Sequence, residues 1–384
     1  MFDGNRLNSA SSFFERHGLQ PSLIAPFRPP TACARRGLWP STRLSAQPPW
    51  SPRACMVTIL LYALLYGQLL QLVAASTVTT LTGDGTAAKT DGVGTNAQHK
   101  SPGMLTLTPD GTRIISTELH SVRQVVLSSA TVTTLAGTTT AGHLDATGAT
   151  ARFNYPMGVA ISSNGLNIYV ADSYNHRIRQ LVLSSTAVTT FAGSGSAGSA
   201  DGVGVLATFD YPYDVCISAD GTKLFVADRD NNIIRQIVIS TTAVSTIAGS
   251  GTAAFADGTG NAASFNSPLG LAMNNDATLY VADFNNHRIR QVAVATGAVS
   301  TLAGSGSEAH ADGTGNGASF AKPWGVGVGP DGATLYVAAP GSDRVRDITI
   351  ATGVVGTVAG SGTQGFAECA RRTLSNLAHT TSSA

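Results

Sequence analysis

The stretch YVADSYNHRIRQ, Tyr169–Gln180, returns as FVADRDNNIIRQ from Phe225 and as YVADFNNHRIRQ from Tyr280. Its acid, asparagine, histidine and arginine are residue types that occur in catalytic and metal sites. A motif that recurs along one chain is also the mark of a repeated fold. The spacing of the copies therefore has to be established before their chemistry.

Four series of residues share one period of 55 or 56 residues. The arginine of the motif recurs at Arg123, Arg179, Arg235, Arg290 and Arg346. A glycine recurs at Gly83, Gly137, Gly193, Gly249, Gly304 and Gly360, a loop acid at Asp91, Asp145, Asp201, Asp257 and Asp312, and a proline at Pro102, Pro156, Pro212, Pro268 and Pro323. Series that stay in register over this length indicate that each copy is one structural unit.

Each period contains four short segments rich in Val, Ile, Thr and aromatic residues, bounded by Gly, Asn, Asp or Ser. In one copy they are residues 157–162, 167–172, 177–184 and 187–193. No segment after residue 76 has a convincing helical pattern. Four antiparallel strands in every period predict an all-β fold, the β-propeller, in which each blade is a small sheet packed on its neighbours around a channel.

The motif copies closely resemble the NHL repeat, whose Asn-His-Leu here reads Asn-His-Arg at Asn175–Arg177 and at Asn286–Arg288. The resemblance covers roughly residues 77 to 362 and is strongest in the copies that begin at Tyr169, Phe225 and Tyr280. It implies a propeller, commonly of six blades. It implies no single activity, because a fold does not determine a function.

The number of blades is left open by the two ends of the repeat region. The chain holds five full four-stranded repeats and one extra outer strand, which starts at Thr77. An N-terminal outer strand can complete the last blade and close a ring. The repeat pattern is lost at Cys369, so residues 363–384 are a truncated last repeat or a tail. The fold is therefore expected to be an NHL-type propeller in residues 77–362, either six-bladed with a truncated last blade or five-bladed.

Two segments precede the repeats. Residues 1–55 carry seven arginines against Asp3 and Glu15, with many Pro and Ser, and are expected to be disordered. Residues 56–76 are apolar and uncharged, and about 20 such residues can span a bilayer. They are interpreted as a signal peptide or a signal-anchor transmembrane segment, with an Arg-rich organellar presequence as the alternative. The expectation is a secreted or single-pass membrane protein with the propeller outside the cytoplasm.

The net charge of the repeat region indicates which classes of partner the propeller could bind. Residues 77–362 contain 15 Lys and Arg against 20 Asp and Glu, a net charge of −5. Proteins that bind nucleic acid need a basic face to neutralise phosphates. Nucleic acid is therefore not expected as a partner, and the membrane is expected to be contacted only through residues 56–76.

The repeated polar residues are interpreted as structural. His120, His176 and His287 occupy the same position in different blades, whereas one zinc ion needs its nitrogen ligands at roughly 2.1 Å. The motif's Asp, Asn and Arg are expected to stabilise the turn and the neighbouring blade by hydrogen bonds. No catalytic or metal-binding residue is predicted from the motif.

Residues that differ between copies are better candidates for function. They lie around the recurring proline, where the innermost strands begin and the channel mouth is expected. The candidate binding residues are Tyr155, Met157, Asp210, Tyr211, Tyr213, Asp214, Lys322 and Trp324. Aromatic rings with a few polar groups suit a pocket or a protein-binding face, and the alternative is that they only cap the core. Asp210, Asp214, Asp228 and Asp230 form an acidic patch that could bind calcium or remain solvated.

These observations favour an extracytoplasmic binding or scaffold module for a protein, peptide or glycan, without a required cofactor. The alternative is a metal-dependent propeller enzyme that resembles lactonases or amidating lyases. The second function would need carboxylates or histidines from several blades to converge, and no such set is evident in the sequence.

Overall fold

The computed structural model describes residues 79–364. The predicted segments 1–55 and 56–76, and residues 365–384 of the tail, lie outside the described residues. In the described part the only helical elements are single turns of 3-10 helix, so the structure is all-β as expected. No helix among residues 79–364 is long and apolar enough to cross a membrane.

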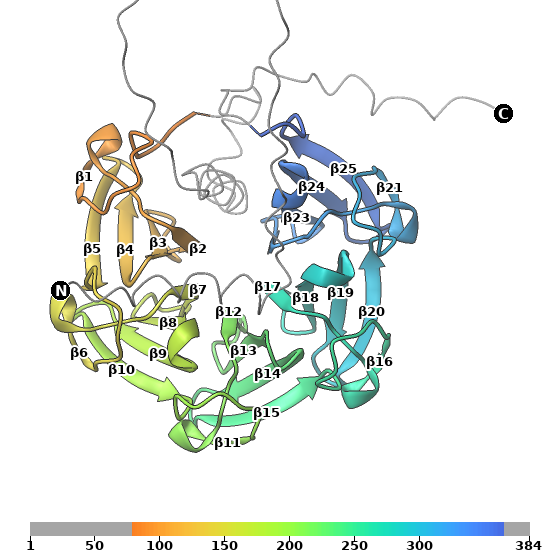
Figure 1. Ribbon diagram of the computed structural model, residues 1–384, viewed down its shortest axis with the longest axis horizontal. Coiled ribbons are helices and arrows are strands. Elements are labelled where there is room, and N and C mark those ends of the chain that lie inside the picture. The colour runs from red at the N-terminus through yellow and green to blue at the C-terminus, as the bar shows by residue number, and fades with distance from the viewer. Residues whose placement is uncertain (1–78, 365–384) are drawn as a thin grey trace, which may run out of the picture. The chain divides into compact units, whose positions relative to one another are not determined.

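The described strands form five sheets, which Figure 1 shows arranged as the blades of a propeller around a common axis. The first blade consists of β1 (Gly92–Val93), β2 (Pro102–Leu107), β3 (Arg113–Glu118), β4 (Ser121–Val126) and β5 (Thr131–Gly137). The second consists of β6 (Ala146–Thr147), β7 (Pro156–Ile161), β8 (Asn167–Asp172), β9 (Arg177–Val182) and β10 (Ala187–Ala192). The third consists of β11 (Gly202–Val203), β12 (Pro212–Ile217), β13 (Lys223–Asp228), β14 (Ile233–Val238) and β15 (Ala243–Ala248).

The last two blades repeat this order. The fourth consists of β16 (Gly258–Thr259), β17 (Pro268–Asn274), β18 (Thr278–Asp283), β19 (Arg288–Ala293) and β20 (Ala298–Ala303). The fifth consists of β21 (Gly313–Thr314), β22 (Gly325–Val328), β23 (Thr334–Ala339), β24 (Arg344–Thr349) and β25 (Val354–Ala359). The four long strands of each blade confirm the prediction made from the repeat.

The short first strand of each sheet was not predicted. Its two residues lie in the linker that enters the blade, and they pair with the outermost long strand of that same blade, as Ala146 does with Val188. A single turn of 3-10 helix follows each time: η2 (Gly94–Asn96), η3 (Gly148–Thr150), η5 (Gly204–Leu206), η6 (Gly260–Ala262) and η8 (Gly315–Gly317). Each sheet therefore has five strands, because the linker pairs with the blade that it enters.

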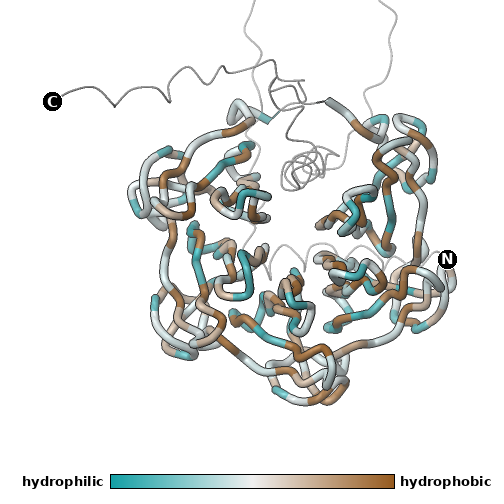
Figure 2. The backbone as a smooth tube through the Cα atoms, turned by 180° about the vertical axis from the view of Figure 1, so that it is seen from behind, coloured by the Kyte–Doolittle hydropathy of each residue, from teal (hydrophilic) through white to brown (hydrophobic). Residues whose placement is uncertain are grey.

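The hydrophobic core lies between blades. One cluster joins Ile115 and Val122 of the first blade to Val159 and Ile168 of the second, with Phe153 of the linker between them. Equivalent clusters join the second blade to the third, the third to the fourth and the fourth to the fifth. Figure 2 shows the same distribution, with apolar stretches along the strands of every blade. The phenylalanines that recur three residues before the proline are thus wedges between blades: Phe153, Phe209, Phe265 and Phe320.

The extra outer strand expected from Thr77 is not formed in the described residues. Residues 79–83 have no strand assignment, although Leu81 packs on the apolar residues of the first blade. The equivalent residue one repeat later, Leu135, belongs to β5 and packs on the second blade. A strand needs hydrogen-bonded neighbours, and residues 79–83 have no neighbouring strand in the described part. Residues 79–364 thus form five blades.

Candidate functional site

The motif arginines are the centre of a polar brace in each blade, and all five side chains are fully buried. In the second blade Nη1 of Arg179 donates to Asp172 at 2.7 Å and to the Arg152 carbonyl at 3.1 Å. Nη2 donates to Asp145 and to the Leu144 carbonyl. One guanidinium therefore ties the strand β8 to the linker in several directions, which its planar arrangement of donors allows.

The same brace recurs with local changes. Asp228 and Asp201 accept from Arg235, and Asp283 and Asp257 accept from Arg290. The first blade uses Glu118 and Asp91 with Arg123, whereas the fifth has only Asp312 with Arg346, because Ala339 occupies the place of the second acid. The expected structural role of the motif's acid and arginine is confirmed.

The asparagine and the wedge phenylalanine complete the brace. Asn175 Nδ2 donates to Asp172 and to the Gly142 carbonyl, both at 2.8 Å. The Arg179 guanidinium lies 5.2 Å from the ring centroid of Phe153, a cation–π arrangement. Burial outweighs the attraction of the arginine and raises the pKa of Asp172 to about 6.

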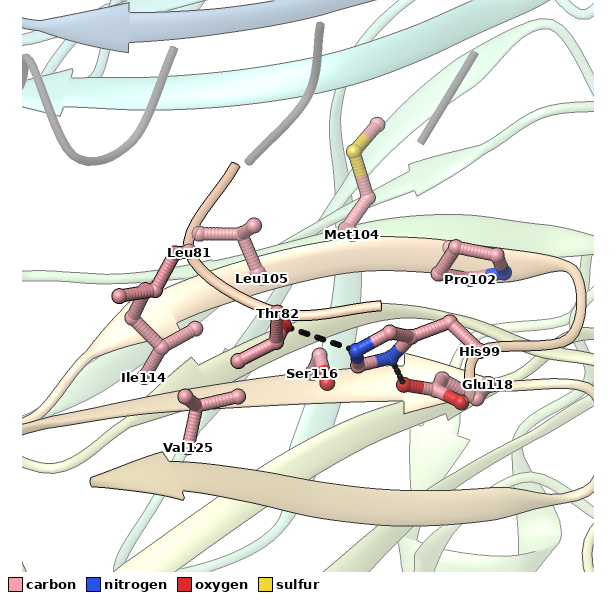
Figure 3. Close-up of a pocket in the computed structure, with 11 residues that line it drawn as sticks. Leu81, Thr82, His99, Pro102, Met104, Leu105, Ile114, Ser116, Glu118 and Val125 are labelled. Carbon is pink, nitrogen blue, oxygen red and sulfur yellow. Dashed lines mark hydrogen bonds and ion pairs between the residues drawn. The ribbon is translucent and has the colours of Figure 1, made fainter. Parts of the chain in front are cut away.

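The first blade has His99 where the other blades have the wedge phenylalanine. His99 Nδ1 lies 2.5 Å from Glu118 and Nε2 lies 2.9 Å from the Thr82 hydroxyl, as Figure 3 shows. These groups border a cavity with about 10 Å³ of water-accessible volume, roughly what one water molecule requires. The cavity is too small for a substrate, so the His99 pair is a local variant of the brace.

The motif histidines link one blade to the next. Nδ1 of His120 accepts the backbone N–H of Tyr155 at 3.2 Å, and Nδ1 of His176 accepts that of Tyr211 at 3.1 Å. His287 accepts the N–H of Lys322 in the same way, at 3.2 Å. In the third blade, which has no histidine here, Asn232 Oδ1 accepts the N–H of Ser267 at 2.9 Å. We call these four hydrogen bonds the rim latches.

Every latched residue has a left-handed backbone. The φ angles are 45° at Tyr155, 57° at Tyr211, 54° at Ser267 and 52° at Lys322. Such a conformation costs an L-residue about 1 kcal/mol or more. The latch offsets this cost by giving the N–H an acceptor, and it fixes the backbone of the residue that precedes each recurring proline.

Seven rings gather on this rim in what we call the aromatic belt. They come from the starts of the innermost strands and from the loops between the second and third long strands: His120, Tyr155, Tyr174, Tyr211, Tyr213, Phe284 and Trp324. The ring centroids of Tyr155 and Tyr174 are 5.0 Å apart, and those of Tyr174 and Tyr211 are 4.6 Å apart. A second group follows from Tyr213 through Trp324 to Phe284, with centroids 5.9 Å and 6.0 Å apart.

Arg229 connects the two groups of rings. Its guanidinium carbon lies 4.8 Å from the centroid of Tyr211 and 5.9 Å from that of Tyr213, while its Nε pairs with Asp230 at 3.3 Å. Burial raises the pKa of both tyrosines above the usual range. Tyr211 and Tyr213 are thus neutral and buried, with 8% and 4% of their surface exposed, and a charged pair lies beside them.

The structure brings together most of the predicted site residues. Tyr155, Tyr211, Tyr213 and Trp324 are members of the belt, and Met157 packs on the same apolar cluster. Tyr155 is the most accessible ring, with 40% of its surface exposed. Lys322 pairs with Glu308 at 3.4 Å, and Asp210 lies 3.3 Å from His176 Nδ1. These positions place the residues at one rim, and their role in binding stays a prediction.

Asp214 differs from the rest because its carboxylate is buried between innermost strands. It accepts the N–H of Val215 at 2.8 Å and, from the neighbouring blade, the N–H of Leu271 at 2.9 Å. Burial raises its pKa to about 7, against the opposing effect of these two hydrogen bonds. With 2% of its surface exposed, Asp214 connects two blades from a buried position, and its role in binding stays a prediction.

The acidic patch proposed for calcium does not converge. Asp228 bonds to Arg235, Asn231 and the Asp210 N–H, and Asp214 bonds to backbone groups. The described residues contain no group of three His, Cys, Asp or Glu placed to hold a metal ion. The donor set for the metal-dependent alternative is therefore not found within residues 79–364.

Sequence reasoning missed three members of the site. All three lie in the loop between the second and third long strands: Arg229 and Phe284 follow directly on the motif's aspartate, and Tyr174 lies two residues after it. The residue at the position directly after the motif's acid differs in every copy. This variation could have identified the loop as part of the site, but variation between copies was considered only at the starts of the innermost strands.

Comparisons with known proteins agree with this architecture. A family model described as NHL repeat matches residues 153–181 and 265–292. Protein SUPPRESSOR OF QUENCHING 1, chloroplastic, from Arabidopsis thaliana is 27% identical over 253 residues, 62% of this chain and 24% of that protein. NHL repeat-containing protein 2 from Bos taurus is 37% identical over 105 residues, 27% of this chain and 14% of that protein. The chain thus spans about a quarter or less of these relatives.

Solved structures with a similar backbone have little sequence in common with this chain. An auxiliary nutrient binding protein from Bacteroides thetaiotaomicron has 14% identity and a TM-score of 0.48, over 73% of this chain and 76% of that one. Virginiamycin B lyase from Staphylococcus aureus has 15% identity and a TM-score of 0.41, over 66% of this chain and 68% of that one.

Proposed function

We propose that the propeller of this chain, which belongs to the NHL-repeat family, is an extracytoplasmic binding or scaffold module. Its aromatic belt contacts a protein, peptide or glycan. The observation that carries the proposal is the continuity of the belt across blades. Five blades each contribute at least one ring to the same rim, although the repeat does not require an aromatic residue at those positions.

The composition of the belt supports binding rather than core packing alone. Tyr and Trp offer a large apolar surface with a polar edge, and they are enriched where proteins contact partners. Tyr155 is exposed although it has an unfavourable backbone conformation, which a rim latch maintains. A residue held in this way suits a recognition surface, because little conformational entropy is lost on binding.

The chemistry around the belt limits the ligand. Arg229 with Asp230 and Lys322 with Glu308 place paired charges beside the rings, so the rim has no uniform sign of charge. The net charge of −5 over residues 77–362 gives no support for phosphate-rich partners. A ligand with flat or apolar groups and a few hydrogen-bonding edges fits these features.

Export across a membrane is part of the proposal. Its support is the apolar and uncharged segment 56–76, which lies outside the described residues, and the arginines that precede it. Mass spectrometry of terminal peptides from protein of native cells would test it. A mature chain that starts near Ser76, or an intact chain whose propeller is digested by external protease, supports export. A propeller protected on intact cells contradicts it.

Binding is tested with the full chain on a glycan array and a random-peptide display library. Tyr155→Ala and Trp324→Ala should each lower the retained signal at least about tenfold for shared hits, as losses at central aromatic contacts do. Leu166→Ala is the matched control, since Leu166 is an exposed apolar residue, 55% accessible, in the turn between β7 and β8. Equal signals for all three variants would contradict the role of the belt.

The metal-dependent enzyme, for which residues 79–364 hold no donor set, is the alternative that a separate experiment tests. It predicts a stoichiometric metal in purified, undialysed protein and a lower melting temperature after chelation. Metal analysis and a thermal scan with and without chelator distinguish it from a binding module, whose melting temperature would not respond.

A further inference from the structure

His176 has two competing partners for one ring nitrogen. Its Nδ1 lies 3.1 Å from the backbone nitrogen of Tyr211 and 3.3 Å from Oδ1 of Asp210. The Tyr211 N–H needs a lone pair on Nδ1, so it bonds only to the neutral ring with its proton on Nε2. The Asp210 carboxylate needs a proton on Nδ1. The two hydrogen bonds therefore exclude each other.

From this geometry we propose that His176 is a positioning residue of the aromatic belt, which fixes Tyr211 when neutral and releases it when protonated. The proposal rests on the belt being the binding surface proposed above. A proton from solvent adds to the Nδ1 lone pair, the Tyr211 N–H loses its acceptor, and the new Nδ1–H donates to Asp210. Histidine is the side chain that ordinarily changes charge between pH 5 and 8.

Release of Tyr211 would change the middle of the aromatic belt. Tyr211 has a φ angle of 57°, and its ring lies 4.6 Å from that of Tyr174 and 4.8 Å from the Arg229 guanidinium. Without the latch, the Tyr211 N–H loses the acceptor that offsets its left-handed backbone. Acid should therefore loosen the contact between the two groups of rings and weaken ligand binding there.

Charged groups face His176 from several elements. Asp210 comes from the linker into the third blade, and Asp230 comes from the loop between β13 and β14. Arg229, next to Asp230, opposes them but is paired with that carboxylate. On its own element, Arg177 is turned toward the carbonyls of Asn175 and Ser194.

The other latches serve as references. Asn232 makes the same hydrogen bond to Ser267 at 2.9 Å, and an amide does not titrate in this range. His120 and His287 have no carboxylate within hydrogen-bond distance of Nδ1 in the described residues, and the pKa of each is lowered, chiefly by burial. His176 thus differs from the other two histidines, because its protonated ring has the Asp210 carboxylate within reach of Nδ1.

Amide hydrogen exchange of the full-length protein tests the proposal without a ligand. Mass spectrometry with fragmentation reads the amides of Tyr211 and Ser267 at pH 8 and pH 5, corrected for the intrinsic rate at each pH. We expect protection at Tyr211 to fall at least about tenfold relative to Ser267. Parallel changes at both amides would overturn the proposal, whatever the belt binds.

Two variants separate positioning from simple stability. His176→Asn supplies a non-titrating acceptor, as Asn232 does, and should keep Tyr211 protected at both values of pH. Asp210→Asn removes the partner of the protonated ring and should move the loss of protection to lower pH. If His176→Asn does not fold, the Asp210 variant still decides. An unchanged pH profile in either variant would refute the mechanism.

Discussion

Gly158 and Asp214 face each other across two innermost strands so closely that a Cβ on Gly158 would lie 2.4 Å from the Asp214 Cα and 2.5 Å from its Oδ1. The glycine lies on β7 and the aspartate on β12, in neighbouring blades. The absence of a side chain at Gly158 is what allows these two innermost strands to pack so closely.

Gly158→Ala is expected to destabilise the protein by about 2 kcal/mol or more, because overpacking forces backbone shifts. The atoms that the new methyl group would meet belong to backbone and to a buried carboxylate, so neither can move away cheaply. Gly317→Ala is the matched control, since a Cβ there meets nothing within 4 Å. Urea denaturation of both variants measures the difference, and equal midpoints would contradict the account.

Asp214 should make stability depend on pH. Its pKa rises from 3.8 to about 7 on folding because of burial. The native state therefore holds a proton that the unfolded chain releases between these values, and stability falls as pH rises through this window, by up to about 4 kcal/mol. Above about pH 7 the loss is complete.

Asp214→Asn tests this linkage through the pH dependence of the free energy of unfolding, not through its absolute value. The amide cannot titrate, so the free energy of unfolding from pH 5 to pH 8 should decline less than in the natural protein. Denaturation at several values of pH gives both curves. Parallel curves would show that Asp214 is already ionised at pH 5.

Arg179→Lys should cost about 3 kcal/mol or more, because breaking a buried ion pair leaves an uncompensated charge. Lysine has no planar fork and cannot reach Asp172, Asp145 and two carbonyls at once. Arg113→Lys, at an exposed position, should change stability by less than about 0.5 kcal/mol. Thermal and chemical unfolding of the two variants provide the measurement.

His287→Asn should reduce acid sensitivity. The pKa of His287 is lowered in the folded protein, first by burial and then by Lys322 and Arg288, against the effect of Glu308. The unfolded chain thus binds more protons as pH falls below the ordinary histidine value, so stability is present above that value and is lost below it. The asparagine keeps an acceptor for the Lys322 N–H, and melting temperatures at pH 7 and pH 5 should differ less than in the natural protein.

The sequence predicted what depends on the repeat and on local pattern. Strands such as β8 and β13 are short runs of apolar and aromatic residues that are buried almost throughout, and Arg179 recurs with its acid, so blade and brace were both foreseeable. The rim latches were not, because His176 and Tyr211 lie in different repeats and meet only after neighbouring blades pack. Asp214 was placed at the channel mouth for the same reason: its spacing from Pro212 is local, whereas its burial against Leu271 is not.

The pairing of each linker with the blade that it enters sets the boundaries of the folding unit. Because Ala146 pairs with Val188, the second blade is tied together from its entry to its last strand by contacts within its own sequence. The strand pairs of the blade are therefore complete within one repeat, whereas its apolar core is completed only by the neighbouring blades. The natural unit of duplication or loss extends from one short strand to the next, so genes for such proteins can change length by whole blades while every surviving sheet keeps all its strands.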